Sequence, residues 1–176
     1  VFTAQTNYQE IVVTQWGKDR RLYLNGGLQY STRDEYRYTE SLTYPTLTDT
    51  TESVLIIGGG DGLAARELLK VPTIHRITQV ELDPMMIETA NTVLLADNQG
   101  ALKDPKVHVV IDDAFSWVRA GGDGQRYDAI IVDLPDPDTE IVGRLYTEEF
   151  YAMLLKQLTS RGIMTVQSSS SFTTPD

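Results

Sequence analysis

Cysteine is absent from this chain of 176 residues, and histidine occurs only at His75 and His108. A disulfide framework, a thiolate nucleophile and a cysteine-based zinc site are therefore excluded, and so is a histidine-rich metal site. No apolar run approaches the roughly 18 residues that a membrane-spanning helix needs, and no signal peptide is visible. We expect no bound metal.

Positive charge is also scarce. The chain has 15 Lys and Arg residues against 25 Asp and Glu residues, which gives a net charge of −10. Nucleic acids and anionic lipid surfaces both require clustered Lys and Arg, so the balance argues against either as a partner. A solvated acidic surface explains such a balance in many proteins, but it is also compatible with a polycationic small molecule.

Residues 1–48 predict a small antiparallel β unit. Asn25-Gly26-Gly27 is a strong hairpin signal between two strand patterns. Its strands are expected over 8–14, 20–24 and 28–30, followed by a short helix over 32–42 with Asp34 or Thr32 near its start. Pro45 and a linker rich in Thr and Asp then separate this unit from the second predicted domain, 49–176.

The second domain alternates apolar strands with helices. The expected strands are 54–57, 77–80, 107–111, 129–132 and 163–166, and the expected helices are 63–70, 84–96 and 148–158, the last ending near Gly162. Asp61 lies at or near the start of the first helix, and Asp83-Pro84 opens the second. This alternation predicts an α/β fold with a doubly wound, Rossmann-like parallel sheet of the class I methyltransferase type.

A polar residue follows each predicted strand. These positions are Gly58–Asp61, Glu81, Asp112-Asp113, Asp133 and Gln167. Ligands of open α/β sheets bind outside the carboxyl ends of the strands, where all five positions meet. Turn formation alone explains one acidic residue at such a position, but it does not explain the whole set.

The turn Gly58-Gly59-Gly60-Asp61-Gly62 would let the backbone press against a ligand. Leu63 stands where the dinucleotide fingerprint has its third glycine, so the turn by itself indicates only some kind of nucleotide site. Glu81, about twenty positions later, suits a ribose diol, although a capping or solvated carboxylate is the alternative.

Two further carboxylates lie at the same edge. Asp133 and Asp136 flank Leu134-Pro135, and Pro137 follows, so prolines fix the backbone that aims both side chains. A nucleotide does not need these carboxylates, whereas a cationic co-substrate would. A simple turn is the alternative interpretation. Asp113 could accept a hydrogen bond from an adenine amino group.

Taken together, an ordered series of motifs resembles the polyamine aminopropyltransferases, the spermidine synthase family. The series runs from about residue 8 to Gln167, and it consists of Tyr8-Gln9, Leu24–Gln29, Asp34–Tyr38, Gly58–Gly62, Glu81–Asp83, Asp113 and Asp133–Pro137. The resemblance implies transfer of an aminopropyl group from decarboxylated S-adenosylmethionine to putrescine or a related polyamine. The donor is a co-substrate, and no prosthetic group is implied. The products would be methylthioadenosine and a spermidine-type amine.

The resemblance also implies roles by position. On the donor side, Glu81 would hold the ribose hydroxyls and Asp113 the adenine amino group, next to Gly58 and Gly60 of the turn, with Gln9 assisting at the nucleoside. Around the aminopropyl ammonium it implies Gln29, Asp61 and Asp133.

On the acceptor side, the resemblance implies that Tyr38, Asp136 and Gln167 line the amine groove, with Asp133 as the catalytic base. Asp61 would repel the α-carboxylate of ordinary S-adenosylmethionine and pair with the ammonium of the decarboxylated donor.

The chain departs from the family pattern at Leu134-Pro135, where small hydroxylated residues are common, and at Tyr44, where a histidine is often found. The Leu-Pro variant and the start without Met resemble a subgroup whose soluble domain is joined to an N-terminal membrane-spanning region. We therefore expect a cytoplasmic domain of a parent protein with such a region. A homodimer is a further expectation, because family members commonly pair.

Two other functions share parts of this pattern. A class I S-adenosylmethionine-dependent methyltransferase has the glycine turn, the ribose acid and the fold, but it needs neither Asp61 nor the pair Asp133 and Asp136. A non-catalytic domain that binds a nucleoside or a polyamine is the second alternative.

Overall fold

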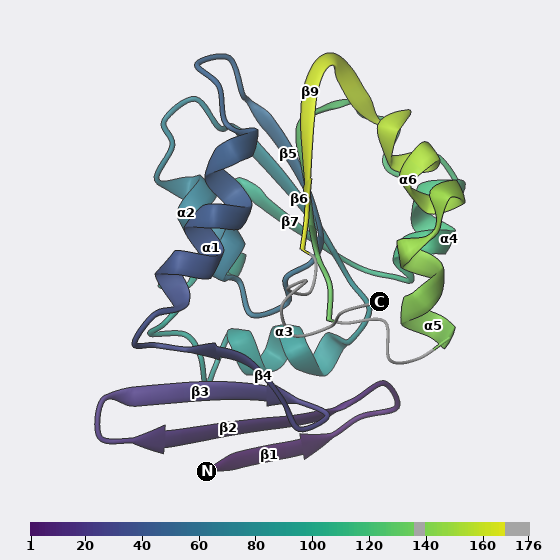
Figure 1. Ribbon diagram of the computed structural model, residues 1–176. Helices are drawn as coiled ribbons and strands as arrows, with labels where there is room; N and C mark the ends of the chain where they lie inside the picture. The colour runs from purple at the N-terminus through teal and green to yellow at the C-terminus, as the bar shows by residue number, and fades with distance from the viewer. Residues whose placement is uncertain (136–139, 168–176) are drawn as a thin grey trace, which may run out of the picture.

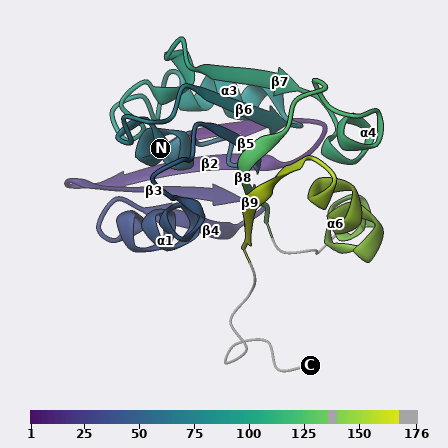
Figure 2. The same cartoon turned by 90° about the horizontal axis from the view of Figure 1, so that it is seen from above.

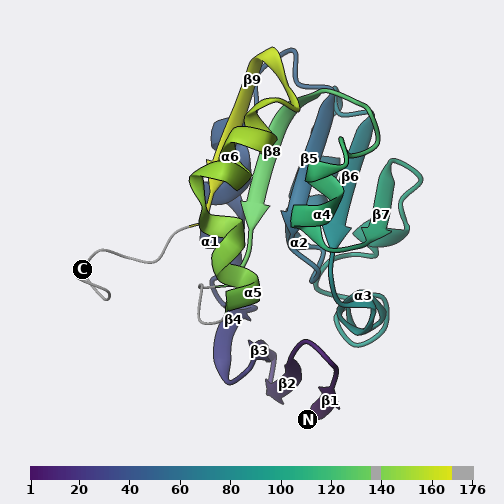
Figure 3. The same ribbon diagram turned by 90° about the vertical axis from the view of Figure 1, so that its right-hand side faces the viewer.

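The computed structural model describes residues 1–135 and 140–167. Two β-sheets make up the molecule, and the larger one is covered by helices on both faces (Figure 1). The smaller sheet lies across the end of the larger one, with helix α3 next to it (Figure 1, Figure 3). Among the described residues, none of the helices has the length and apolar character needed to cross a membrane.

The smaller sheet is antiparallel, with its strands in sequence order. Its strands are β1 (Phe2–Gln5), β2 (Glu10–Trp16), β3 (Asp19–Leu24) and β4 (Gly27–Ser31). The three strands and the hairpin predicted from the sequence are confirmed, because Leu24 pairs with Gly27 across the Asn25-Gly26 turn. The prediction missed β1, a four-residue edge strand whose only partner is β2.

The larger sheet is parallel and has the strand order β7-β6-β5-β8-β9. Its strands are β5 (Ser53–Gly58), β6 (Arg76–Glu81), β7 (Val107–Ile111), β8 (Tyr127–Asp133) and β9 (Leu158–Val166). The order reverses beside β5, which makes the sheet doubly wound, as the alternation of strands and helices predicts. Residues of β5 and β8 are almost fully buried, as a central parallel strand requires.

Helices α1 and α2 cover one face of this sheet, and α4 and α6 cover the other (Figure 1, Figure 2). The α-helices are α1 (Glu35–Thr43), α2 (Leu63–Leu69), α3 (Pro84–Ala90), α4 (Ala114–Arg119), α5 (Glu140–Gly143) and α6 (Glu148–Leu155). Short 3-10 helices complete the described part: η1 (Tyr44–Thr46), η2 (Ala101–Lys103) and η3 (Arg144–Tyr146).

Three apolar clusters hold these layers together. The first joins the inner sides of α1 and α2 to the sheet, and the second joins α4 and α6 to its other face. The third packs the antiparallel sheet against α2, α3 and the segment that follows α3, through Ile11, Leu22, Leu63, Met86 and Leu94. The antiparallel sheet is thereby fixed over the carboxyl ends of the parallel strands, as Figure 3 shows.

Two helix ends differ from the sequence prediction. Helix α3 ends at Ala90 rather than near 96, because the buried side chain of Asn98 donates to the Ala90 carbonyl oxygen at 2.9 Å. Helix α6 ends at Leu155, and β9 already begins at Leu158. Gly162 therefore does not end the helix. It lies inside β9, where the register shifts and where a Cβ would approach the Tyr127 carbonyl oxygen to 2.9 Å.

Candidate active site

Asp133, the last residue of β8, receives a hydrogen bond from a helix far away in the sequence. The Tyr38 hydroxyl on α1 donates to Asp133 Oδ1 at 2.6 Å. The two residues are 95 positions apart. The contact therefore joins the predicted catalytic base to the predicted acceptor groove.

The glycine turn after β5 lies directly against Asp133. The Gly59 N–H donates to the Asp133 carbonyl oxygen at 3.0 Å, and both Gly58 and Gly59 have positive φ angles. A Cβ on Gly58 would lie 2.2 Å from that carbonyl oxygen, and one on Gly59 would lie 3.2 Å from Asp133 Oδ2. Glycine is required here both by the backbone conformation and by the close approach of Asp133.

Asp61 stands at the point where this turn becomes α2. Its carboxylate accepts a hydrogen bond from the Leu63 N–H at 2.9 Å, while Gly62 is the capping residue in the left-handed conformation. The prediction of Asp61 near the helix start is thus confirmed. Asn98 donates to the Asp61 carbonyl oxygen at 2.8 Å, so both the side chain and the backbone of Asp61 are held.

Glu81, at the end of β6, faces the same turn. The Asp83 N–H donates to Glu81 Oε1 at 3.0 Å, and a Cβ on Gly60 would lie 2.6 Å from Glu81 Oε2. The carboxylate that was predicted to bind ribose therefore lies directly against the Gly60 backbone, where no side chain would fit. Asp83 caps α3 by accepting from the Met85 N–H at 3.0 Å.

The pKa values show that these carboxyls form one electrostatic unit. Desolvation, followed by the charge of Asp133, raises the pKa of Asp61 to about 8. Desolvation raises the pKa of Glu81 to about 7, with the charges of Asp83 and Asp133 adding to the effect. Desolvation also raises the pKa of Asp133. Carboxyls that oppose each other's ionisation are stabilised by a cation placed among them.

The antiparallel sheet reaches this cluster through Gln9. Its side-chain amide donates to Asp83 Oδ2 at 3.0 Å, and Thr6 donates to the same oxygen at 2.9 Å. Gln9 therefore contacts Asp83, the residue two positions after Glu81, on the side where the nucleoside was predicted.

Asp113 has a structural role in addition to its predicted role at the adenine amino group. It caps α4 by accepting from the Ser116 N–H at 2.8 Å, and it forms an ion pair with Arg144. The Arg144 guanidinium also lies over the Phe115 ring, 5.5 Å from the centroid. Helix α4 itself was not predicted from the sequence.

The remaining predicted residues have different outcomes. Gln167 follows β9 beside Asp133, with its N–H donating to the Val132 carbonyl oxygen at 2.9 Å and its buried Oε1 without a partner among the described residues. Gln29 donates to the Gly27 carbonyl oxygen at 3.2 Å, within its own hairpin, and no hydrogen bond of the described chain joins it to the acidic cluster. Asp136 lies outside the described residues.

Sequence reasoning missed Gln79, which holds the glycine turn. Its side chain is fully buried on β6, and its amide donates to the carbonyl oxygens of Gly58 at 3.1 Å and Gly59 at 2.6 Å. A glutamine inside an otherwise apolar strand, two positions before Glu81, was the available signal.

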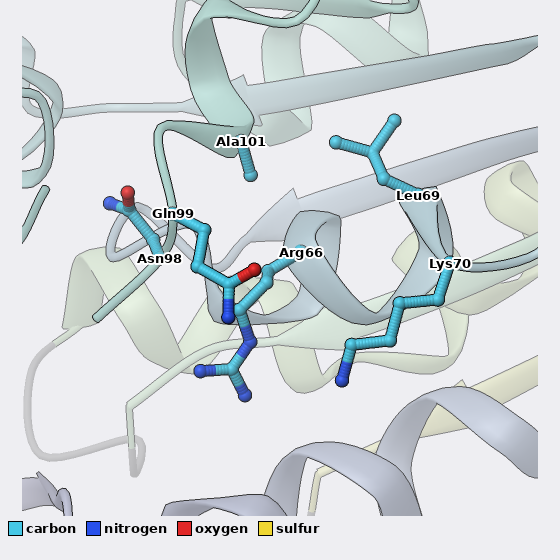
Figure 4. Close-up of a pocket in the computed structure, with 6 residues that line it drawn as sticks. All are labelled: Arg66, Leu69, Lys70, Asn98, Gln99 and Ala101. Carbon is cyan, nitrogen blue, oxygen red and sulfur yellow. The ribbon is translucent and has the colours of Figure 1, made fainter. Parts of the chain in front are cut away.

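A shallow hollow of about 230 Å³ lies elsewhere on the surface, beside α2 (Figure 4). It is lined by Arg66, Leu69, Lys70, Asn98, Gln99 and Ala101. None of these is a predicted site residue, and both cations are already engaged by Glu67. Across the residues that the structure describes, no group of three or more potential ligands is arranged to hold a metal ion.

A glycine turn and the carboxyls of Asp61, Glu81 and Asp133 meet at the carboxyl ends of the strands, which places the chain in the class of doubly wound α/β proteins whose ligands bind at that edge. Comparisons with known proteins narrow this class. Residues 35–176 match the family model described as "Spermine/spermidine synthase domain". The chain is 67% identical over 177 residues to a polyamine aminopropyltransferase of Corynebacterium efficiens, and this alignment covers 100% of the chain.

A polyamine aminopropyltransferase of Mycobacterium tuberculosis is 60% identical over 169 residues, 96% of the chain. Two solved structures share the fold: spermidine synthase in complex with the transition state analogue AdoDATO (TM-score 0.89, 30% identity) and spermidine synthase from Thermotoga maritima (TM-score 0.86, 29% identity). Each alignment covers 98% of this chain, and 59% and 58% of those chains.

The chain belongs to the spermine/spermidine synthase family, and the resemblance seen in its sequence is confirmed. It spans 34% of the length of the Corynebacterium efficiens relative and 32% of the Mycobacterium tuberculosis relative.

Proposed function

We propose that the full-length protein transfers an aminopropyl group from decarboxylated S-adenosylmethionine to putrescine or a related polyamine. The observation that carries the proposal is the position of Asp133, which lies against the glycine turn and accepts a hydrogen bond from the Tyr38 hydroxyl. Desolvation raises the pKa of Asp61 and Glu81, and the charge of Asp133 adds to both shifts. Family membership and the neighbour solved with a transition-state analogue support it.

The main obstacle to this reaction is that the amine nucleophile is protonated. The donor carbon is bonded to a sulfonium sulfur, so the leaving group departs as a neutral thioether and needs no general acid. An alkylamine is protonated at neutral pH, since its pKa resembles the roughly 10.4 of lysine. Asp133 would hold the ammonium group of the acceptor and accept its proton. It would also align the resulting amine with the donor carbon and the sulfonium sulfur. Such proton transfer contributes about 10²–10⁴-fold, and alignment contributes further.

On the donor side, Glu81 would bind the ribose hydroxyls over Gly58 and Gly60, and Gln9 would assist at the nucleoside. Asp113 would accept from the adenine amino group once Arg144 releases one of its oxygens. The ion pair with Arg144 supports this role, because the same carboxylate already accepts from a nitrogen donor.

Around the aminopropyl ammonium, Asp61 and Gln29 would act with Asp133. Asp61 would also select the donor: the aminopropyl ammonium lowers the Asp61 pKa and keeps the carboxylate ionised, and this charge opposes the α-carboxylate of ordinary S-adenosylmethionine. On the acceptor side, Tyr38, Asp136 and Gln167 would line the amine groove. The unpartnered Oε1 of Gln167 supports its part, since it can accept from an ammonium or amine N–H.

The test is an assay of methylthioadenosine formation by the full-length protein with decarboxylated S-adenosylmethionine and a panel of diamines and triamines. In Asp133→Asn we expect turnover to fall about 10²–10⁴-fold while donor binding by calorimetry persists. Asp49→Asn, an exposed aspartate, is the matched control and should retain turnover.

Other outcomes would identify the alternatives. Tighter binding of ordinary S-adenosylmethionine than of its decarboxylated form would point to a methyltransferase. Donor binding without turnover of any amine would point to a non-catalytic binding domain.

We further propose three features of the full-length protein: a homodimer, a cytoplasmic position of this region with a membrane-spanning region elsewhere in the parent, and a domain boundary near residue 48. Family resemblance supports the first two. Sedimentation of the full-length protein, fractionation of cells that express it, and limited proteolysis test the three in turn.

A further inference from the structure

Two adjacent residues of α2 hold both ends of α1. Arg66 forms a two-pronged ion pair with Glu35, the first residue of α1, with both nitrogen–oxygen distances at 2.9 Å. Glu67 accepts a hydrogen bond from the hydroxyl of Tyr44, the residue that caps the other end of α1, at 2.8 Å. Arg66 and Glu67 also bond to each other at 3.0 Å.

The charged pair Arg66 and Glu67 at the centre of this network is buried. The Glu67 side chain is 1% exposed and that of Arg66 is 9% exposed. Arg66 also donates to the Asp97 carbonyl oxygen at 2.8 Å, and Lys70 donates to Glu67. Paired guanidinium and carboxylate groups have a fixed geometry, whereas apolar packing alone allows a helix to slide.

The helix that this network fixes carries Tyr38, three residues after Glu35. The helix that provides the network begins at Leu63, two residues after Asp61. The spacing between Asp61 and the Tyr38–Asp133 hydrogen bond therefore depends on the registration of α1 against α2. No part of this network touches the acidic cluster itself through a side-chain hydrogen bond within the described chain.

We infer that Arg66 is a positioning residue, which sets Tyr38 on Asp133 by clamping Glu35 and, through Glu67, Tyr44. The inference rests on the proposed function for its kinetic readout. A misplacement of about 1 Å at a reacting group costs on the order of 10²-fold in rate. In Arg66→Lys the charge remains but the two-pronged contact is lost, so we expect kcat to fall about 10- to 100-fold, with donor affinity changed less than about threefold.

A double-mutant cycle separates positioning from general destabilisation. If Arg66 acts through Tyr38, Arg66→Lys adds little to the loss already present in Tyr38→Phe. In addition, the pH–rate profile of Arg66→Lys shifts in the direction seen for Tyr38→Phe, because the Tyr38 hydrogen bond lowers the pKa of Asp133. The inference would be overturned if Arg66→Lys lowered kcat by the same factor in the parent and in Tyr38→Phe, with no shift of its pH–rate profile.

Further variants keep the test decisive. Tyr44→Phe removes one hydrogen bond at a half-exposed position, so it should fold, and it should reproduce the effect in smaller size if Arg66→Lys does not fold. An unchanged kcat in Tyr44→Phe would then count against the clamp. Arg76→Lys, which alters a 2.7 Å ion pair with Asp123, is the matched control and should retain kcat. Full turnover in Asp133→Asn would contradict the proposed function. If Asp133→Asn loses turnover but the effects of Arg66→Lys and Tyr38→Phe are additive, only the positioning role of Arg66 is contradicted.

Discussion

At the scale of single residues, Asp61 is expected to make stability depend on pH. Its pKa is raised to about 8 in the folded protein, against about 3.9 in an unfolded chain. Between these values the unfolded chain has lost this proton and the folded protein keeps it, so folding becomes less favourable as the pH rises. The carboxylate cluster thus costs stability at neutral pH and above, where a bound cation would offset the cost.

The free energy of unfolding should therefore decrease from about pH 4 to about pH 8, by an amount on the order of a few kcal/mol. Asp61→Asn should flatten this decrease and be more stable than the parent above pH 8. Urea unfolding at a series of pH values measures the difference, with Asp49→Asn as the control. Parallel curves for the parent and Asp61→Asn would contradict the assignment of this effect to Asp61.

The absence of a side chain at Gly60 is expected to be important for binding of the donor. A Cβ there would lie 2.6 Å from both Glu81 Oε2 and Met86 Cγ, so alanine would displace the Glu81 carboxylate. A hydrogen bond to a charged group contributes about 1.5–3 kcal/mol, so we expect Gly60→Ala to weaken donor binding roughly 10- to 100-fold. Gly143→Ala, at a helical glycine with open space around it, should bind the donor normally. Calorimetry with the decarboxylated donor compares the two.

At the scale of elements, the glycine turn depends on the strand beside it. Gln79 on β6 donates to the carbonyl oxygens of Gly58 and Gly59, which belong to the end of β5 and the turn. The site geometry is therefore set jointly by two neighbouring strands. Sequence patterns describe each strand separately, and for that reason the contribution of Gln79 was not foreseen.

Gln79→Leu should lower the free energy of unfolding by about 1–3 kcal/mol for each carbonyl left without a partner. It should also weaken donor binding, because the turn loses its support. Thr78→Val is the matched control: Thr78 is equally buried on the same strand, and its hydroxyl bonds to the Asp123 side chain at 3.5 Å rather than to the glycine turn. Thermal unfolding and calorimetry of both variants test this, and equal donor affinity in the two would refute it.

At the scale of the whole molecule, Asp97 ties the antiparallel sheet to the second domain. Its carboxylate accepts from Arg20 on β3 at 2.7 Å and from the Tyr30 hydroxyl on β4 at 2.9 Å. The apolar cluster around Ile11 and Met86 lies in the same interface. Polar and apolar contacts of the sheet thus keep Gln9 on Asp83, close to Glu81.

Asp97→Asn should lower the free energy of unfolding by about 1–3 kcal/mol, since a partly buried, charge-assisted contact is lost. Limited proteolysis should then cut first within residues 1–34, as the sheet separates from the second domain. Arg33→Gln removes an exposed side chain that pairs with Asp19 at 3.6 Å, and because Asp19 keeps Arg21 at 2.8 Å the effect should stay below about 1 kcal/mol. Similar losses in both variants would show that Asp97 has no special role in docking the sheet.

The sequence determined by itself the elements that depend on local patterns. Apolar runs gave the parallel strands, Asn25-Gly26 gave the hairpin, and Asp83-Pro84 gave the start of α3. It also determined the edge of the sheet to which Asp61, Glu81 and Asp133 belong, because a parallel sheet brings the ends of its strands together. The structure was needed for α4 and β1, which are short, and for the ends of α3 and α6.

Only the tertiary structure decided which distant residues meet. Tyr38 on Asp133, Gln9 on Asp83 and Arg66 on Glu35 each join segments that no period or spacing relates. Gln29, by contrast, stays within its own hairpin. The physical reason is that helix registration and the docking of the antiparallel sheet are fixed by buried polar pairs and apolar packing between layers. Those contacts exist only once both partners are folded.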